Sequence, residues 1–253
     1  MTVSTIGTGP IHVVALHGWF GTGSSWLPTV NWLDPGAYTI AIPDHRGYGS
    51  RIDDPGEYTV AEIASDAIAV ADELGWRGFD IVGHSMGGKA AQLVAAKAPE
   101  RVRRVVAVTP VPPAPLPFDD DTRALFRAAA GDLTTRAAII GNSTADRHSS
   151  RFVDMIVEES RLSRTEAFAA YFESWAGDDI TAAVNGLPTP VSVIAGEHDN
   201  ALNAEVLQEA ILPFYPNAEL LVMAAAGHYP LFETPVALAS VIDTFLSQPA
   251  QEV

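Results

Sequence analysis

The chain has 253 residues, of which 47% are hydrophobic and 18% are charged, so it can bury a large core and intrinsic disorder is not expected. Its formal net charge of −16 disfavours nucleic acids and anionic membrane surfaces as partners, because both would repel it. There are no cysteines, which excludes disulfides, thiolate metal sites and a cysteine nucleophile.

The N-terminal segment MTVSTIGTGP has neither a basic stretch nor an apolar one, so we expect no signal peptide. No apolar run approaches the roughly 18 residues that a membrane-spanning helix needs. We therefore expect a cytoplasmic protein with no membrane partner.

Apolar, β-branched segments recur along the chain and are typical of buried strands. They cover residues 11–18, 38–44, 79–83, 102–110, 190–199 and 218–228. Helical patterns lie between several of them, at 59–75, 86–98 and 235–248. The first helix begins at Thr59, with Glu62 three residues later as in a capping box. This alternation predicts a doubly wound, mostly parallel α/β sheet with helices on both faces.

One region breaks the alternation. After the proline-rich stretch at 110–118, the pattern is helical near 119–131, 132–141, 148–160 and 163–176, without a convincing strand. We therefore expect a helical cap at 111–186, inserted between two parts of the core at 1–110 and 187–253.

The segment FDIVGHSMGGKAA at 79–91 places Ser85 between a short strand and a small-residue helix. The chain must reverse there within about five residues, and a side chain at Gly83 or Gly87 would block so sharp a turn. The pattern G-x-S-x-G is typical of a nucleophile elbow, which exposes the serine hydroxyl.

Other interpretations of the glycines are weaker. The same segment nearly matches the phosphate-binding loop G-x-x-x-x-G-K-[ST], but Ala90 stands where a hydroxyl should reach magnesium. The stretch at 21–23 is only a fragment of a dinucleotide-binding motif, because it lacks the third glycine. A plain glycine-rich turn with a solvated serine stays open until the rest of the chain is considered.

A serine hydroxyl is a weak nucleophile and needs a base that is held by an acid. In enzymes with this elbow, the acid and then the histidine follow the serine along the chain. Of the seven histidines, His228 fits the base best, because it follows the last strand-like run. Asp199 fits the acid better than Glu197, and His84 is expected to point away from Ser85.

A negatively charged oxygen in the transition state needs two preorganised donors, which are usually backbone N–H groups. Met86, the residue after the nucleophile, is expected to supply one at the start of its helix. Trp19, in the loop LHGWFGTGSSW, is the expected second donor of this oxyanion hole.

The motifs LHGW, DHRGYGS, GHSMGGKA, AGEHD and AGHYPLFETP occur in this order along the chain. Together they resemble the α/β-hydrolase superfamily, in particular the small single-domain carboxylesterases with a helical cap, over residues 10–247. The resemblance implies an α/β-hydrolase fold and a structural role for Asp44 and Arg46 near the site. It implies no cofactor, and no H-E-x-x-H motif or histidine pair suggests a metal site.

Apolar side chains are candidates for the substrate pocket, although packing in the core is the commoner role of buried aromatic side chains and the favoured one for each of them. These candidates are Phe20, Phe126, Met155, Phe172, Trp175 and Tyr229. Several arginines of the cap could receive a carboxylate, but surface arginines are more often solvated.

The favoured function is that of a carboxylesterase acting on small, mostly neutral esters. A lactonase or another specialised acyl hydrolase is the alternative. Haloalkane dehalogenases and epoxide hydrolases of this superfamily use an aspartate nucleophile, whereas position 85 is serine. A C–C bond hydrolase, a cofactor-free haloperoxidase and a ligand-binding receptor stay open, because a fold does not determine its chemistry. The sequence does not indicate an oligomeric state.

Overall fold

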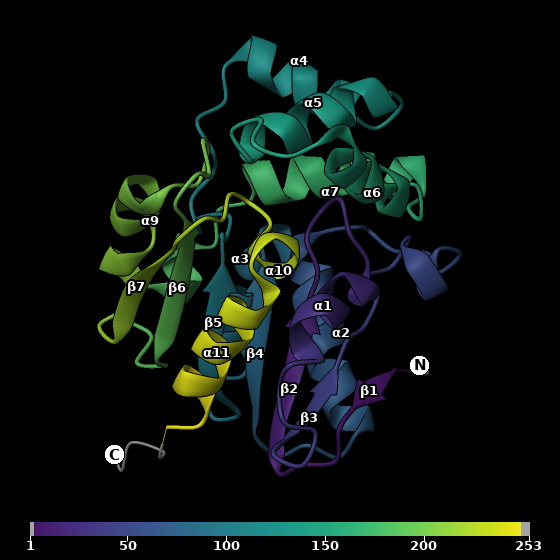
Figure 1. Cartoon of the computed structure of the whole chain (residues 1–253). Helices are drawn as coiled ribbons and strands as arrows, with labels where there is room; N and C mark the ends of the chain where they lie inside the picture. The colour runs from purple at the N-terminus through teal and green to yellow at the C-terminus, as the bar shows by residue number, and fades with distance from the viewer. Residues whose placement is uncertain (1–2, 249–253) are drawn as a thin grey trace.

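The computed structural model describes residues 3–248, and a seven-stranded sheet runs through its centre (Figure 1). The strand order is β1-β3-β2-β4-β5-β6-β7. The strands are β1 (Thr5–Ile6), β2 (Ile11–Leu16), β3 (Tyr38–Ala41), β4 (Phe79–His84), β5 (Val102–Val108), β6 (Val191–Gly196) and β7 (Ala218–Met223). All pairs are parallel except that of β1 with β3. The predicted doubly wound, mostly parallel sheet is confirmed.

All six predicted strands are present, and most of them end earlier than predicted. Their last residues leave the sheet for loops, and these loops carry Asp44, Asp199 and His228. The edge strand β1 was not predicted, because two residues are too few to show an alternating pattern.

Helices cover both faces of the sheet because successive side chains of a strand point to opposite faces. In β2, Val14 and Leu16 pack in the cluster that contains α2 (Val60–Glu73) and α3 (Met86–Lys97). Val13 and Ala15 pack on the other face with α11 (Pro235–Leu246). The remaining core helices are α1 (Leu27–Val30), α9 (Ala204–Ala210) and α10 (Pro230–Glu233), with a 3₁₀ turn η1 (Gly23–Trp26) before α1.

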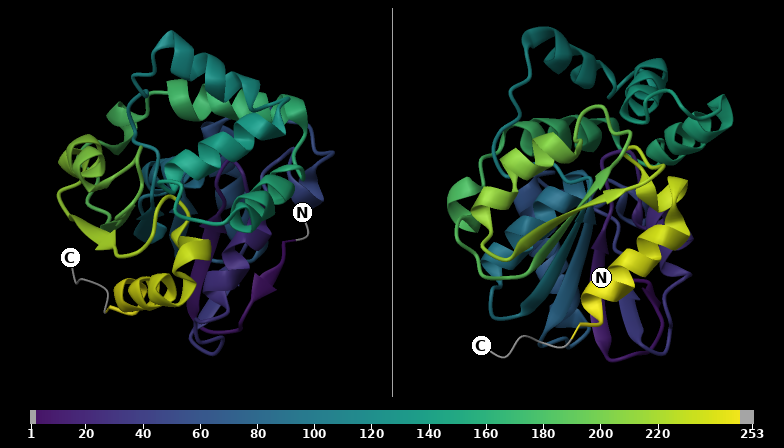
Figure 2. Two further views of the ribbon diagram at one scale, coloured as in Figure 1. Left: turned by 45° about the horizontal axis from the view of Figure 1, so that its top comes forward. Right: turned by 60° about the vertical axis from the view of Figure 1, so that its left-hand side comes forward.

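Five helices lie between β5 and β6 in the chain, and α4 to α7 sit above the sheet in Figure 1. They are α4 (Asp120–Ala128), α5 (Leu133–Ser143), α6 (Ser150–Ser160), α7 (Thr165–Gly177) and α8 (Thr181–Val184). Four of them overlap the predicted helical runs, whereas α8 is too short for a helical period to be visible. Figure 2 shows this layer from two further sides.

Side chains of the core hold α7 by hydrogen bonds to its backbone. The indole Nε1 of Trp19 donates to the carbonyl of Phe168 at 2.7 Å. The buried Lys89 of α3 donates to the carbonyls of Trp175 and Asp178 at 3.0 and 2.6 Å. Burial lowers the pKa of this ammonium group to about 8. These bonds tie the helical layer to the elbow helix and to the loop after β2.

The turn at Ser85 is strained and crowded. The residue has φ 54° and ψ −115°, and residues other than glycine rarely adopt a positive φ. A Cβ atom at Gly83 would lie 2.2 Å from the carbonyl oxygen of Gly87, and one at Gly87 would lie 2.5 Å from that of Leu16. Both contacts are with backbone, which cannot move aside without distorting the sheet.

We therefore expect Gly83→Ala to lower the free energy of unfolding by about 1–3 kcal/mol or more, because it overpacks a rigid turn. Gly131→Ala is the matched control, since a Cβ there meets no atom within 4 Å. Urea denaturation of the two variants and the native chain measures the difference. Equal stability of the two variants would contradict the steric argument.

The carboxylate of Asp80 in β4 is buried, with 1% of its side chain exposed, and its Oδ2 lies 2.9 Å from Arg103. Burial raises the pKa of Asp80 to about 6, against the lowering effect of Arg103. Between about pH 4 and pH 6 the folded chain therefore keeps a proton that the unfolded chain releases. Raising the pH through this window lowers the free energy of unfolding.

This effect predicts a pH-dependent difference between the native chain and Asp80→Asn. The stability of the variant relative to the native chain should rise by up to about 3 kcal/mol from pH 4 to pH 6 and stay level above that. Urea denaturation at a series of pH values measures it. A relative stability that does not change with pH would show that Asp80 has an ordinary pKa in the folded chain.

Candidate active site

Ser85, Asp199 and His228 lie on three loops that follow β4, β6 and β7, and the structure brings them together. The Nε2 atom of His228 is 2.9 Å from the Oγ of Ser85. Its Nδ1 atom is 2.6 Å from the Oδ2 of Asp199. The arrangement is a continuous chain of hydrogen bonds from a hydroxyl through an imidazole to a carboxylate.

The surroundings of Asp199 keep it ionised. Its Oδ1 accepts hydrogen bonds from the N–H groups of Ala201 and Leu202, both at 3.0 Å. Burial raises the pKa of Asp199, but His228 and these hydrogen bonds outweigh it, so the pKa is lowered overall. An ionised Asp199 accepts a hydrogen bond from Nδ1–H of His228, and this tautomer leaves Nε2 without a hydrogen and facing the Oγ of Ser85.

Glu197, the other candidate acid, points elsewhere. Its carboxylate accepts a hydrogen bond from the N–H of Ala225 at 2.8 Å and is half exposed. It supports the β7 loop from outside and forms no hydrogen bond with His228.

The expectation that His84 points away from the site is wrong. Its Nε2 donates to the carbonyl oxygen of His228 at 2.7 Å, and its ring lies beside the ring of Tyr229, with centroids 5.5 Å apart. Burial and the nearby His228 lower the pKa of His84 to about 3. His84 therefore stays neutral and holds the loop of His228 without competing for its proton.

Glu233 holds the same loop from the other side and was missed by the sequence analysis. Its side chain is fully buried and accepts hydrogen bonds from the N–H groups of Gly227 and Tyr229 at 2.8 and 2.9 Å. It also lies 2.7 Å from the Nε2 of His148. These contacts place the backbone on both sides of His228. The sequence feature that could have identified Glu233 is its place in the motif AGHYPLFETP, which also contains His228.

A narrow pocket opens beside Ser85 and His228. The space in it that water can enter measures about 10 Å³, room for about one water molecule. Its walls are mostly apolar, as is usual in binding pockets. The lining residues are Trp19, Phe20, Gly21, Ser25, His84, Ser85, Ile156, His228, Tyr229, Leu231 and Phe232.

Only two of the six candidate pocket residues, Phe20 and Tyr229, line this pocket. Phe126, Phe172 and Trp175 instead pack around the indole of Trp19, with ring centroids 5.9, 5.7 and 5.4 Å from it. They support the pocket wall from behind. The contributions of Ser25 in η1 and Ile156 in α6 to this wall could not be read from strand and helix patterns.

Met155 does not line this pocket, so that prediction is wrong. Its side chain is 45% exposed and lies in a shallow groove on the outer side of α6, with Phe152 and Glu158. The next residue, Ile156, is the one that reaches the pocket, because neighbouring residues of a helix point about 100° apart.

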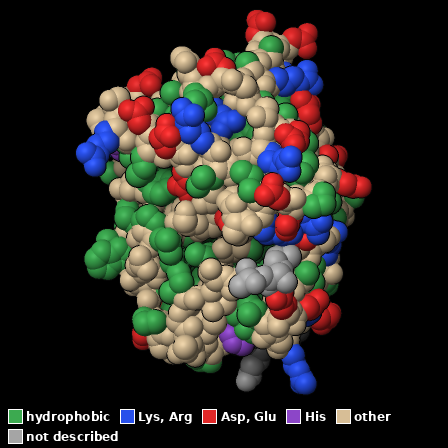
Figure 3. All heavy atoms as spheres, turned by 90° about the vertical axis from the view of Figure 1, so that its right-hand side faces the viewer, with side chains coloured by type: hydrophobic (Ala, Val, Ile, Leu, Met, Phe, Trp, Pro, Cys, Tyr) green, Lys and Arg blue, Asp and Glu red, His purple; other side chains and the backbone are tan. Residues whose placement is uncertain are grey.

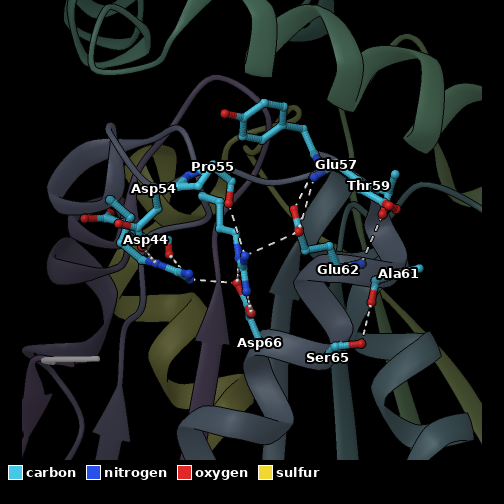
Figure 4. Close-up of polar contacts among 12 residues, drawn as sticks. Asp44, Asp54, Pro55, Glu57, Thr59, Ala61, Glu62, Ser65 and Asp66 are labelled. Atoms are coloured by element: carbon cyan, nitrogen blue, oxygen red, sulfur yellow. Dashed lines mark hydrogen bonds and ion pairs between the residues drawn. The ribbon is translucent and has the colours of Figure 1, made fainter.

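A network of charges holds the loop that contains Asp44 and Arg46 (Figure 4). Arg46 binds both carboxylate oxygens of Asp66 at 2.9 Å, and Arg51 binds the same group at 2.8 Å. Asp44 accepts hydrogen bonds from the N–H groups of Gly23 and Ser50 at 2.8 and 2.7 Å. Through Gly23, the loop is connected to the segment that lines the pocket, and its ion pairs and hydrogen bonds stabilise the fold there.

Among the residues that the structure describes, five arginines of the helical layer pair with carboxylates of the same chain, namely Arg123, Arg127, Arg147, Arg161 and Arg164. Arg127, for example, lies 2.6 Å from Glu173, and Arg161 lies 2.9 Å from Glu158. On the face drawn in Figure 3, basic and acidic side chains alternate over the upper half. This pairing leaves little reason to assign these arginines to a bound carboxylate.

Within residues 3–248, no cluster of three or more His, Asp or Glu side chains is arranged to hold a metal ion. None of the helices in the same range combines the length and the apolar character that crossing a membrane requires.

Comparison with known sequences gives a family and several relatives. The model of the alpha/beta hydrolase family matches residues 13–241. Epoxide hydrolase 3 of Siraitia grosvenorii is 34% identical over 137 residues, which are 52% of this chain and only 42% of that relative. The 2-hydroxymuconate semialdehyde hydrolase of Pseudomonas putida is 27% identical and covers 83% of this chain and 77% of its own length. The pimeloyl-(acyl-carrier protein) methyl ester esterase of Yersinia pseudotuberculosis is 26% identical, with 96% of each chain covered.

Solved structures agree on the fold. A bromoperoxidase from Bacillus anthracis and an esterase from Exiguobacterium antarcticum each superimpose with a TM-score of 0.85 at 21% identity. Each match covers 97% of this chain and 95% of the other. Since the family model spans most of the chain and the fold agrees with it, the protein belongs to the alpha/beta hydrolase family.

Proposed function

We propose that the protein is a serine hydrolase that cleaves carboxylic esters with small acyl groups through an acyl-enzyme at Ser85. The observation that carries the proposal is the chain of hydrogen bonds from Ser85 through His228 to Asp199. A hydroxyl 2.9 Å from a neutral imidazole nitrogen can lose its proton as it attacks.

The reaction has two halves. Ser85 Oγ bonds to the ester carbonyl carbon while its proton passes to Nε2 of His228, and the resulting imidazolium returns that proton to the departing alcohol. Water then attacks the acyl-enzyme, with His228 again accepting the proton, and the acid is released as Ser85 recovers its hydrogen. Asp199 stabilises the imidazolium in both halves and does not itself take the proton.

The N–H groups of Trp19 and Met86 form the oxyanion hole in this proposal. Within residues 3–248 neither group donates a hydrogen bond, so both are free to bind an oxyanion. Met86 is the first residue of α3, where unpaired N–H groups and the helix dipole favour negative charge. The helices α4 to α8 act as the cap, and Ile156 of α6 closes the pocket over the acyl group.

Ester hydrolysis fits the residues better than epoxide opening. Relatives include both a methyl ester esterase and an epoxide hydrolase. The resemblance to epoxide hydrolases implies an aspartate nucleophile, whereas this chain has Ser85 at the elbow. An uncharged, apolar pocket also suits a neutral acyl group better than a charged one.

The acyl-chain preference tests the proposal. We expect kcat/KM for acetate esters to exceed that for octanoate esters by about tenfold or more. The pocket has room for only a small acyl group, and each methylene that does not fit raises the activation free energy. Acid release from acetate, butyrate and octanoate esters and from small lactones, followed by titration, measures it.

The rates on these esters and lactones distinguish the possible functions. Equal rates on acetate and octanoate would contradict the assignment of the acyl pocket. Faster opening of lactones than of any open-chain ester would replace the esterase by a lactonase. No acid release from any of these substrates would overturn the proposal of an ester hydrolase.

A further inference from the structure

One carboxylate of the cap makes an unusual set of contacts with the core. We define the oxyanion loop as residues 18–25. The Oε1 atom of Glu159, in α6, lies 2.8 Å from the Oγ1 of Thr22, 3.1 Å from the Oγ of Ser24 and 2.7 Å from the Oγ of Ser25. The N–H of Thr22 donates to the same atom at 3.2 Å. A single carboxylate oxygen is therefore the common acceptor for this loop.

The place of this carboxylate follows from the backbone. The oxyanion loop contains the first three residues of η1 and leads into α1, and the first N–H groups of a helical segment have no backbone partner within it. Asp44 of the core accepts from the N–H of Gly23 at 2.8 Å, and the N–H of Thr22 is shared between the Oγ of Ser25 at 3.1 Å and Glu159 of the cap at 3.2 Å. Two carboxylates, one from the core and one from the cap, thus accept from neighbouring N–H groups at the start of this helical segment.

The hydroxyl and N–H donors of the oxyanion loop stabilise the charge of the Glu159 carboxylate. Within the described part of the chain, residues 3–248, no arginine, lysine or histidine lies close enough to Glu159 to form an ion pair. Hydrogen bonds to an ionised acceptor are stronger than those between neutral groups. The contact between α6 and the oxyanion loop therefore depends on the carboxylate rather than on a salt bridge.

The contact lies next to both parts of the proposed active site. Ile156, one turn before Glu159 on the same side of α6, lines the acyl pocket, and so does Ser25. Trp19, which carries a proposed oxyanion donor, precedes Thr22 in the same loop. If α6 moved away from the oxyanion loop, the acyl pocket would become larger and the loop would lose its hydrogen bonds to Glu159.

The chain directly after α6 is held by backbone hydrogen bonds. The carbonyl of Leu162 accepts from the N–H of Gly49 at 2.8 Å, and the N–H of Arg164 donates to the carbonyl of Gly47 at 2.9 Å. These bonds do not depend on the side chain of Glu159. They should keep residues 162–164 in place, so that α6 can swing about this point when the contact of Glu159 is weakened.

We infer that Glu159 is a positioning and specificity-determining residue, which holds α6 against the oxyanion loop and thereby limits the size of the acyl group. The kinetic part of this inference rests on the proposed ester hydrolysis. Glu159 touches neither Ser85 nor the substrate in this inference, and it acts through Ile156 and the loop.

Glu159→Gln tests the inference, because the amide keeps the shape and loses the charge. We expect the ratio of kcat/KM for octanoate over acetate to rise about tenfold, with the KM for octanoate falling as the pocket widens. Glu158→Gln is the matched control: it is the preceding residue on α6, its side chain is 66% exposed, and it pairs only with Arg161. The control should keep the native ratio.

Hydrogen exchange gives a readout that does not need activity. In Glu159→Gln, amides of the oxyanion loop and of α6 should exchange about tenfold faster than in the native chain and in Glu158→Gln. Native exchange in Glu159→Gln would overturn the inference whatever the kinetics show. If the native chain hydrolyses no ester, the proposed function fails, and exchange alone decides the role of Glu159. Faster exchange together with an unchanged acyl preference would overturn the specificity role.

Discussion

A Ser85→Ala variant is expected to lose about 10⁶-fold in kcat, on the scale found when the serine of another hydrolase triad is removed. Without the hydroxyl there is no atom to form the acyl-enzyme, and the base His228 has nothing to deprotonate but water. The residual rate would come from the oxyanion donors and the pocket alone. Acid release from acetate esters, with the native chain measured beside the variant, gives this number.

The variant should fold as well as the native chain. Among residues 3–248, the side chain of Ser85 makes one hydrogen bond, to Nε2 of His228, and alanine keeps the same Cβ in the same turn. The urea midpoints of the two proteins are therefore expected to agree, which separates lost chemistry from lost structure. A stable Ser85→Ala protein that retained more than about a hundredth of native kcat would contradict an acyl-enzyme at this residue.

An Asp199→Asn variant is expected to lose about 10⁴-fold in kcat through the wrong tautomer of the histidine. The amide can still accept from the N–H groups of Ala201 and Leu202, so the loop should keep its shape. Its NH₂ group, however, would donate to Nδ1 of His228. That places the imidazole hydrogen on Nε2, where the base must instead accept the proton of Ser85.

Glu197→Gln is the matched control for this prediction, because Glu197 lies two residues earlier on the same loop and was the other candidate acid. It contacts the N–H of Ala225 and should leave kcat within about twofold of native, as surface substitutions usually do. An equal loss of kcat in both variants would show that the loop, and not the carboxylate of Asp199, matters for turnover. A normal rate in Asp199→Asn would remove Asp199 from the mechanism.

The sheet was predictable because its strands are buried on both faces. Parallel strands covered by helices must be apolar nearly throughout, and such runs stand out against the amphipathic helices between them. The elbow was predictable for a steric reason, since the glycines at 83 and 87 stand where a Cβ would meet backbone. Chain order then limited the candidates for the acid and the base.

The lining of the pocket was much less predictable. Phe20 and Tyr229 reach it, Trp175 supports it from behind, and Met155 lies on the outer surface. All four are large apolar residues on or near the predicted site. Which side of a helix faces a cavity depends on how two elements pack, and a list of apolar positions does not contain that information.

The amino-acid sequence by itself determined the order of strands and helices, the elbow at Ser85 and the choice of Asp199 and His228, because each depends on local periodicity, turn sterics or chain order. The tertiary structure alone decided the contacts of His84 with His228, of Glu233 with His148 and of Glu159 with the oxyanion loop, because these partners lie far apart in the chain. A polar side chain is recruited by whichever unpaired N–H or hydroxyl group folding brings within hydrogen-bond distance. That distance exists only once the sheet, the loops and the helices α4 to α8 have packed together.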